Sequence, residues 1–437
     1  MATRDDGVSM TAAIHKATAA LGGITDFVAR SKVWSILLAA MIGGAIGFGA
    51  WGEGRLPLLA VALPPAIGIS GSRARAFAIG LAYVLATERA GPAFIAEWFD
   101  GSFVVGALLW FGSAVIGGVS WSLAWTPSNV PWRKAAASAV AWLLALLPPV
   151  AVLVMGHPII AWGSILQGTG WFGVAASVAA PATFMWHYAK APWRLRTMAI
   201  VFVPVMGAAS VFSVYAYSPI ENRVVGDIAA VSTNWGAAKD EWEILERIER
   251  IGKTNKRFAA DSDVRVVIYP EAAIQRYDPA LYQILKMEII DDAARAGQTV
   301  VLGADLPTKS GNLESAAIAF YPDGKTATAI ARQTVPIALW RPWQAKNSVL
   351  TDWTANNILT LKDGVTARVV FCYEEYIPIL SLMNEARDAH NLVVAMANTW
   401  ASKDPLGAAI QAQHSEGIAK LFGKRILRAE NRPKKDK

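Results

Sequence analysis

Hydrophobic and polar positions divide this chain into two halves of different character. Residues 33–217 carry 13 charged side chains in 185 positions, whereas residues 218–437 carry 55 in 220. So few charges among repeated apolar runs are typical of a membrane-embedded domain, while the second half has the polarity of a soluble domain with one core. The pattern therefore predicts a multi-span α-helical membrane domain followed by a globular domain.

The apolar half contains about seven expected membrane spans. Their approximate bounds are 33–51, 57–71, 76–87, 103–125, 135–156, 158–186 and 197–217. About 20 apolar residues are needed to cross the hydrocarbon, so a re-entrant hairpin is an alternative for the two short runs at 57–71 and 76–87. If these two runs do not cross the membrane, the number of crossings falls by two and the C-terminal domain stays on the same side.

Lysine and arginine residues set the expected orientation. From the N-terminal arm (1–32) through successive loops, their counts are 4, 1, 2, 1, 2, 0 and 3. This alternation places the arm in the cytoplasm of a multi-pass plasma (inner) membrane protein, and residues 218–431 on the outer, periplasmic side, followed by a basic tail at 432–437. Of the net charge of +7, the embedded half contributes +5, so no direct nucleic-acid binding is expected.

The C-terminal half alternates strand and helix signals. Apolar β-branched runs predict strands, and Asp-Pro pairs at Asp278 and Asp404 each provide an N-cap and a first helical residue. The predicted strands include "RVVIYP" (265–270), "TVVLGAD" (299–305), "ARVVFC" (367–372) and "NLVVAMAN" (391–398). Strands interleaved with helices indicate a layered α/β domain.

Two chemically useful side chains follow strands of this domain. Glu271 comes directly after "VVIYP", and the only cysteine of the chain, Cys372, comes directly after "ARVVF". Residues at the carboxyl ends of strands can line a crevice, where a glutamate could activate a thiol for attack on a carbonyl. From the residues alone, a buried small hydrophobe and a loop glutamate remain the alternative interpretation.

Other chemistries find less support in the sequence. The five histidines are dispersed without metal-ligand spacing, and no G-x-S-x-G elbow or glycine-rich phosphate loop is present, so neither a metal nor a cofactor is expected. Asn398, Trp400 and His414 are interpreted as structural residues. The segment Trp340–Trp343 is interpreted either as a lid resting on the membrane or as a packed loop.

"VVIYPEAAI" and "VVFCYEEYIP" resemble the glutamate and cysteine motifs of the nitrilase (carbon–nitrogen hydrolase) superfamily, in particular its membrane member apolipoprotein N-acyltransferase. The resemblance extends over about 219–431, through "ESAAIAFYPDG", "ANTW" and "IQAQHSEGIAKLFGKRILRAEN". It implies a four-layer αββα sandwich, with Glu271 as general base, Cys372 as acyl-accepting nucleophile and Glu374 as a supporting acid. The whole chain also resembles plasmid-encoded relatives of that acyltransferase, which implies a role in conjugal transfer.

The family's catalytic lysine is not matched. In the corresponding stretch "IARQTVPIAL", the lysine position holds Ala331, its neighbour is Arg332, and a glutamate expected after the proline is replaced by Leu339. Arg332 can supply a positive charge to an oxyanion, but a guanidinium does not exchange protons as an ammonium does. Lys325 would need a loop shift to reach the site.

Two hypotheses therefore stand. In the first, the protein is an enzyme, a Cys-dependent amidase or N-acyltransferase that takes an acyl or amide substrate such as a membrane lipid or a lipoprotein-like molecule. In the second, its nitrilase-like domain is an inactive scaffold that binds an envelope partner or a lipid during conjugation.

Overall fold

The computed structural model covers most of both halves of the chain. The residues it describes are 31–99, 101–192, 224–261, 263–402 and 404–434. The expected N-terminal arm, the last expected span at 197–217 and the end of the basic tail thus lie wholly or largely outside the described residues.

The N-terminal half folds into a bundle of helices of very different lengths. Its elements are α2 (Lys32–Ala50), η1 (Pro57–Ala62), α3 (Leu63–Gly68), α4 (Arg73–Thr87), α5 (Gly91–Trp98), α6 (Phe103–Ser122), α7 (Pro131–Ala145), α8 (Val150–Leu153), α9 (Ile159–Ile165) and α10 (Trp171–Lys190). Among the described residues, α2 and α6 are the two helices long and apolar enough to cross a membrane. The expected count of seven spans stays a prediction.

Prolines and glycines break two of the expected spans into pieces. The run 135–156 becomes α7 and the single turn α8, separated at Pro148 and Pro149, because proline removes a helical hydrogen bond. The run 158–186 becomes α9 and α10, separated by a turn in which Gly168 and Gly170 have positive φ. Neither run forms one continuous helix, so length alone was a poor guide here.

The C-terminal half contains two β-sheets. Their strands are β1 (Val224–Val225), β2 (Ile228–Ala230), β3 (Val266–Ile268), β4 (Thr299–Pro307), β5 (Leu313–Phe320), β6 (Thr326–Ile330), β7 (Ile358–Lys362), β8 (Val365–Phe371), β9 (Leu392–Asn398) and β10 (Arg425–Asn431). One sheet has the order β1-β2-β3-β4-β5-β6 and the other the order β10-β9-β8-β7. An apolar core that includes Ile268, Val301 and Phe371 joins the two sheets face to face.

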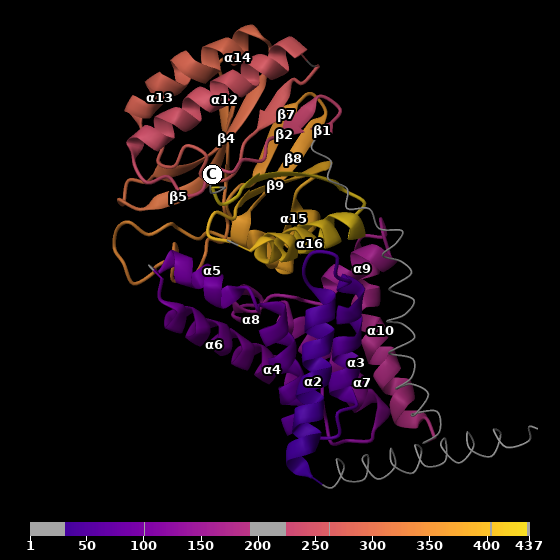
Figure 1. Cartoon of the computed structure of the whole chain (residues 1–437). Helices are drawn as coiled ribbons and strands as arrows, with labels where there is room; N and C mark the ends of the chain where they lie inside the picture. Colours follow the sequence, from indigo (N-terminus) through magenta and orange to yellow (C-terminus); the bar gives the residue numbers. More distant parts are fainter. Residues whose placement is uncertain (1–30, 100, 193–223, 262, 403, 435–437) are drawn as a thin grey trace, which may run out of the picture.

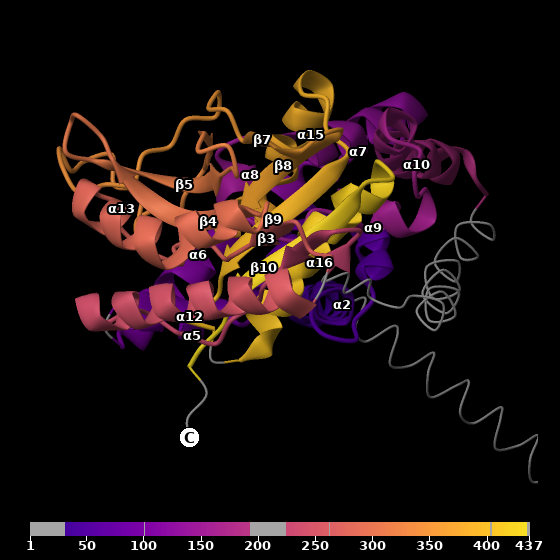
Figure 2. The same ribbon diagram turned by 90° about the horizontal axis from the view of Figure 1, so that it is seen from above.

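Helices cover the outer faces of both sheets and complete four layers. On the first sheet lie α12 (Glu241–Asp261), α13 (Pro279–Leu285), the π-helical turn η2 (Lys286–Ile290) and α14 (Asp291–Arg295). On the second sheet lie α15 (Pro378–Arg387) and α16 (Pro405–Leu421), which Figure 1 places between the strands and the N-terminal helices; Figure 2 shows the layers from above. The expected αββα sandwich is therefore confirmed.

Helix α16 joins the two halves of the molecule. Gly417 and Gly163 of α9 bring their backbones so close that a Cβ on Gly163 would lie 1.9 Å from the Gly417 carbonyl oxygen. Gln413 pairs with both backbone groups of Gly52, at 3.0 and 2.8 Å. His414 is buried, accepts the N–H of Gly156 at 2.9 Å and bonds the Ile410 carbonyl at 2.7 Å, which confirms its interpretation as a structural residue.

Candidate active site

The topology brings Glu271 and Cys372 to one place. Glu271 follows β3 by three residues, and Cys372 follows β8 directly, at the start of the short 3₁₀ helix η3 (Cys372–Tyr376). The Glu271 turn lies flat on β4, because Gly303 has no side chain; a Cβ there would meet the Pro270 carbonyl oxygen at 2.2 Å. Both side chains line the same cavity, as the strand-end argument predicted.

Glu271 is held as a protonated acid at neutral pH. The side chain is 8% exposed, and Ser315 donates a hydrogen bond to its carboxyl oxygen at 3.3 Å. Burial and the nearby Asp305 raise the pKa of Glu271 to about 8, while hydrogen bonds with Cys372 and Ser315 act in the opposite direction. Asp305 is half-buried, and desolvation raises its pKa to about 6.

Cys372 is a neutral thiol in the resting state. Its sulfur contacts the Asn398 carbonyl oxygen at 3.6 Å, and Gln411 donates to its backbone carbonyl at 2.8 Å. Burial and the adjacent Glu271 raise the pKa of the thiol well above its usual value. The two side chains share a hydrogen bond, so a proton can pass from sulfur to the carboxylate in molecules in which Glu271 is ionised.

Glu374 binds backbone N–H groups of two neighbouring segments. Its carboxylate accepts hydrogen bonds from the N–H groups of Gln333 at 3.0 Å and Phe371 at 3.2 Å, and from that of Arg332. Burial raises the pKa of Glu374 to about 7, and these N–H groups partly offset that effect. Glu374 lines neither cavity at Cys372, so it holds two segments beside the site together.

Arg332 does not reach the thiol, contrary to the expectation from sequence. Its side chain is 2% exposed and points toward α15, where it bonds the Ala355 carbonyl at 2.8 Å and the Asn384 amide, with Asp388 at 3.6 Å. The backbone N–H of Arg332 faces Glu374, and the side chain leaves on the other side. Arg332 lines neither cavity, so its guanidinium is not placed to meet an oxyanion formed at Cys372.

No lysine of the described residues takes over the missing position. Ala331 is 1% exposed and packs in the core between the sheets. Lys325 lies at an exposed turn, where its ammonium pairs with Asp323 at 2.6 Å. The two cavities at Cys372 are lined by no lysine among the described residues.

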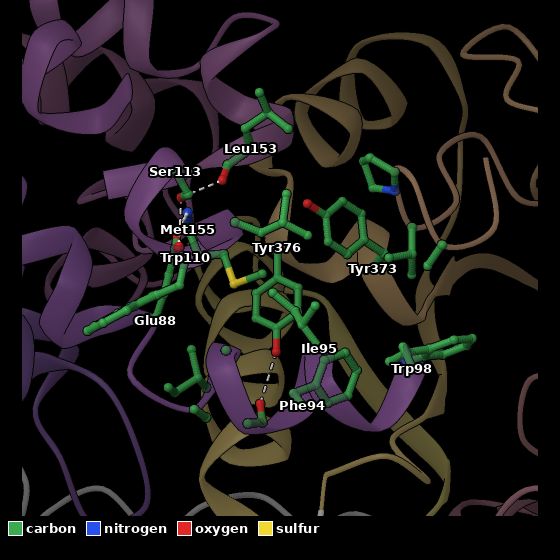
Figure 3. Close-up of a pocket in the computed structure, with 18 of the residues that line it drawn as sticks. Glu88, Phe94, Ile95, Trp98, Trp110, Ser113, Leu153, Met155, Tyr373 and Tyr376 are labelled. Carbon is green, nitrogen blue, oxygen red and sulfur yellow. Dashed lines mark hydrogen bonds between the residues drawn. The ribbon is translucent and has the colours of Figure 1, made fainter. Parts of the chain in front are cut away.

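An apolar cavity of about 350 Å³ extends from Cys372 into the N-terminal half. Its walls come from α4, α5 and α6, from the η3 tyrosines Tyr373 and Tyr376, and from α16 (Figure 3). Phe94, Ile95 and Trp110 are typical of its lining. The helical half therefore supplies a hydrophobic chamber that ends at a thiol of the α/β domain.

A polar network closes one wall of this chamber. Glu88 accepts the N–H of Met155 at 2.8 Å, and Ser113 lies 2.7 Å from Glu88 and 2.8 Å from the Leu153 carbonyl (Figure 3). A hydroxyl has one proton, so Ser113 cannot donate to both oxygens. Both contacts are satisfied when Glu88 is protonated and donates to Ser113, which donates to Leu153.

A second, polar cavity of about 320 Å³ opens on the other side of Cys372. The two cavities share four lining residues, Trp98, Val335, Cys372 and Tyr373. Tyr373 is tied to the helical half, because its hydroxyl donates to the Val152 carbonyl at 2.5 Å. The thiol thus lies where an apolar and a polar compartment meet.

Several of these residues were missed by sequence reasoning. Helix α5, which provides Trp98, was not predicted, and the carboxylate of Glu88 was counted only as a charge. Trp400 and Asn398 line the polar cavity, and the Trp400 ring lies 5.1 Å from that of Trp98. Of the Trp340–Trp343 segment, Trp343 is 65% exposed, so at least this ring does not pack into the domain. No group of residues suited to hold a metal occurs among the described residues.

Comparisons with known proteins agree with this architecture. The family model "Carbon-nitrogen hydrolase" matches residues 227–416. The chain is 25% identical over 422 residues to "Conjugal transfer protein TraB" of Agrobacterium fabrum (strain C58), covering 91% of this chain and 93% of the relative. It is 24% identical over 409 residues to "Probable conjugal transfer protein TraB" of Sinorhizobium fredii (strain NGR234), covering 91% and 97%.

Among solved structures, a variant of an amidase of the nitrilase superfamily from Nesterenkonia is 14% identical, with a TM-score of 0.29, and covers 39% of this chain and 64% of that chain. The family model and the two sandwiched sheets, rather than this likeness, establish the fold. Residues 227–416 thus match the carbon–nitrogen hydrolase family, and the whole chain is similar to the proteins named conjugal transfer protein TraB.

Proposed function

We propose that this protein is a membrane-embedded, cysteine-dependent acyltransferase or amidase that acts in plasmid conjugal transfer. The observation that carries the proposal is the apolar chamber that ends at Cys372 beside Glu271. A thiol that served only as a core residue would not need an access route of this size. The chamber fits the acyl chain of a membrane lipid or of a lipoprotein-like substrate.

The chemistry follows from the pair of side chains. Glu271 in its ionised form takes the thiol proton, and the Cys372 sulfur attacks the carbonyl carbon of the substrate. The tetrahedral intermediate collapses, the bond to the leaving group breaks, and Glu271 returns the proton to that group. Water or an amine then attacks the thioester and Glu271 accepts its proton; the C–S bond breaks, the acyl group leaves on its new acceptor, and Glu271 returns the proton to the sulfur.

The proposal includes integration into the plasma membrane by several spans within 33–217. Support comes from α2 and α6, on which large apolar side chains are exposed to the surroundings, among them Val33, Met41, Val104, Leu108 and Phe111. In this orientation the arm 1–32 is cytoplasmic and the nitrilase-like domain 218–431, with its tail, is periplasmic. The relatives' names suggest that envelope proteins of conjugation are its partners.

Labelling of the thiol tests the enzymatic proposal. The full chain in detergent is treated with a fluorophosphonate-type or other acyl-directed probe, and the adduct is located by mass spectrometry. We expect an adduct on Cys372 in the parent, none in Cys372→Ser and a strongly reduced yield in Glu271→Gln. In donor cells, wild-type transfer frequency by Cys372→Ser at normal protein level would contradict a role for the chemistry in conjugation.

A specific observation supports a second candidate, an inactive nitrilase-like scaffold. Among the described residues, no ammonium lies where the family pattern places one, and the nearest substitute by sequence, Arg332, binds α15 instead. For a scaffold, Cys372→Ser leaves conjugation unchanged, while loss of the whole protein, or disruption of its surface contacts with an envelope partner or lipid, reduces it. Comparing the point variant with the deletion strain separates the two functions.

A further inference from the structure

The polar cavity contains a buried positive charge that the proposed reaction does not use. Arg247 of α12 is 4% exposed, yet no carboxylate of the described residues lies within ion-pair distance of it. One Nη donates to the Gly236 carbonyl at 2.9 Å, and no described hydrogen bond uses its Nε or other Nη. Its guanidinium carbon lies 5.5 Å from the centre of the Trp235 ring, and the charge of Glu243 acts on it from beyond ion-pair distance. A guanidinium has five N–H donors, so those without a described acceptor can donate to a ligand.

Neutral donors without acceptors line the same cavity. The Trp98 indole N–H is buried and has no acceptor among the described residues. The Asn398 amide oxygen accepts a hydrogen bond from Asn431 at 3.0 Å, and its NH₂ group has no described acceptor. At the exposed position next to this cavity, Arg276 adds a second guanidinium.

Acidic groups do not balance these donors. Ser315 and Cys372 are the hydrogen-bond partners of Glu271, and at neutral pH its raised pKa keeps it largely uncharged. Asp305 lines the cavity as well, so among its lining residues two guanidinium groups face one ionised carboxylate. Glu243, whose charge also acts on Arg247, lies outside this lining and is paired with Lys434 at 3.2 Å. An anion in the cavity would satisfy both the positive charge of Arg247 and the free N–H groups.

We propose that the polar cavity is an anion-binding subsite, in which Arg247 pairs with a phosphate or carboxylate group of the substrate. This inference rests on the proposed function, since the two cavities share Cys372 and Trp98. A molecule with its chain in the apolar chamber and its anionic group beside Arg247 presents the carbonyl between them to the thiol. The anion is either the headgroup of a lipid or a free acceptor.

Binding to the full chain carrying Cys372→Ser, which cannot form a thioester, tests the subsite. Dihexanoyl phosphatidic acid, dihexanoylglycerol and inorganic phosphate are titrated separately by calorimetry in a nonionic detergent. We expect the phosphatidic acid to bind about tenfold more tightly than the neutral diacylglycerol, as a charge-assisted hydrogen bond implies. Adding Arg247→Gln removes this preference, whereas Arg247→Lys keeps part of it.

The matched control is Arg250→Gln on the same helix. Arg250 is an exposed arginine, 57% accessible, paired with Glu246 at 3.1 Å, so its loss leaves the preference unchanged. Thermal unfolding of each variant shows whether the fold is intact, because Arg247 also holds the Gly236 turn. Retained preference in a folded Arg247→Gln protein, or equal binding of both lipids by the parent, overturns the subsite.

Two further comparisons distinguish a lipid headgroup from a free anion, and failure of the subsite from failure of the proposed acyl transfer. Binding of inorganic phosphate that depends on Arg247, with no added affinity from the acyl chains, assigns the subsite to a free anion. An Arg247-dependent preference without any acyl adduct on Cys372 in the labelling experiment retains the subsite and rejects acyl transfer. An acyl adduct on Cys372 without an Arg247-dependent preference retains acyl transfer and rejects the subsite.

Discussion

Replacing Glu271 by glutamine is expected to change the stability of the protein in a direction that becomes more favourable as the pH rises from 5 to 8. The carboxyl group has a pKa of about 8 in the folded protein, against 4.5 for an unperturbed glutamate. Between these two values the unfolded chain loses the proton while the folded protein keeps it. The free energy of unfolding is therefore highest below pH 4.5, where Glu271 is protonated in both states. It falls as the pH rises from 4.5 toward 8, because only the unfolded chain releases the proton.

The size of the effect follows from the two pKa values. The penalty for keeping Glu271 protonated is about 1 kcal/mol at pH 5 and about 3 kcal/mol at pH 7. Glutamine does not titrate, so the variant avoids this penalty. The substitution also changes the hydrogen bond from Ser315 at 3.3 Å and the contact with Cys372. Each changed hydrogen bond lowers the free energy of unfolding by about 1 kcal/mol, and this loss does not depend on pH.

Apparent melting temperatures, followed by tryptophan fluorescence at one scan rate in detergent, provide the assay. The difference between Glu271→Gln and the parent should widen by several degrees from pH 5 to pH 7 while labelling of Cys372 falls. Glu246→Gln is the control, because Glu246 lies on an exposed helix face with a side chain that is 63% accessible. A difference that stays constant across this pH range would refute the buried, protonated state of Glu271.

Three further outcomes follow from the geometry. Labelling of Cys372 should increase with pH through about 8, as the base that accepts its proton becomes ionised, and a flat profile would exclude this base. Glu88→Gln should melt like the parent, because an amide can donate and accept as the protonated acid does, whereas Glu88→Ala should melt lower by the equivalent of about 1–3 kcal/mol. Gly163→Ala should raise protease sensitivity between the two halves, while Gly44→Ala, with open space around its Cβ, should not.

Much of the α/β domain was predictable because its signals are local. Apolar β-branched runs gave β3, β4, β8 and β9, and Asp-Pro caps gave the starts of α13 and α16, where Asp278 and Asp404 accept backbone N–H bonds at 2.9 Å. Helix α12 was not predicted, although its charged and apolar faces alternate with a helical period. The placement of Glu271 and Cys372 at strand ends was also sufficient to bring them into one cavity.

The direction of Arg332 could not be predicted, since it depends on a bend in the chain after β6. At this bend the N–H groups of Arg332 and Gln333 both donate to Glu374. Gln333 lines the polar cavity, whereas the Arg332 side chain meets Asn384 and Asp388 on α15. An alignment that moves a charge by one residue therefore changes its surroundings completely.

The walls of the site could not be read from sequence for a different reason: they come from the other half of the chain. Trp98 lies 274 positions before Cys372, on a helix of eight residues that sequence patterns did not reveal. Its place beside the thiol depends on how α16 packs on α9 and on the bond from Tyr373 to the carbonyl of Val152. In the proposed function, the nitrilase-like domain supplies the reactive pair and the helical half supplies the walls that select the substrate. Variants of the helical wall should for this reason change which substrates label Cys372, whereas variants of Glu271 should reduce labelling by all of them.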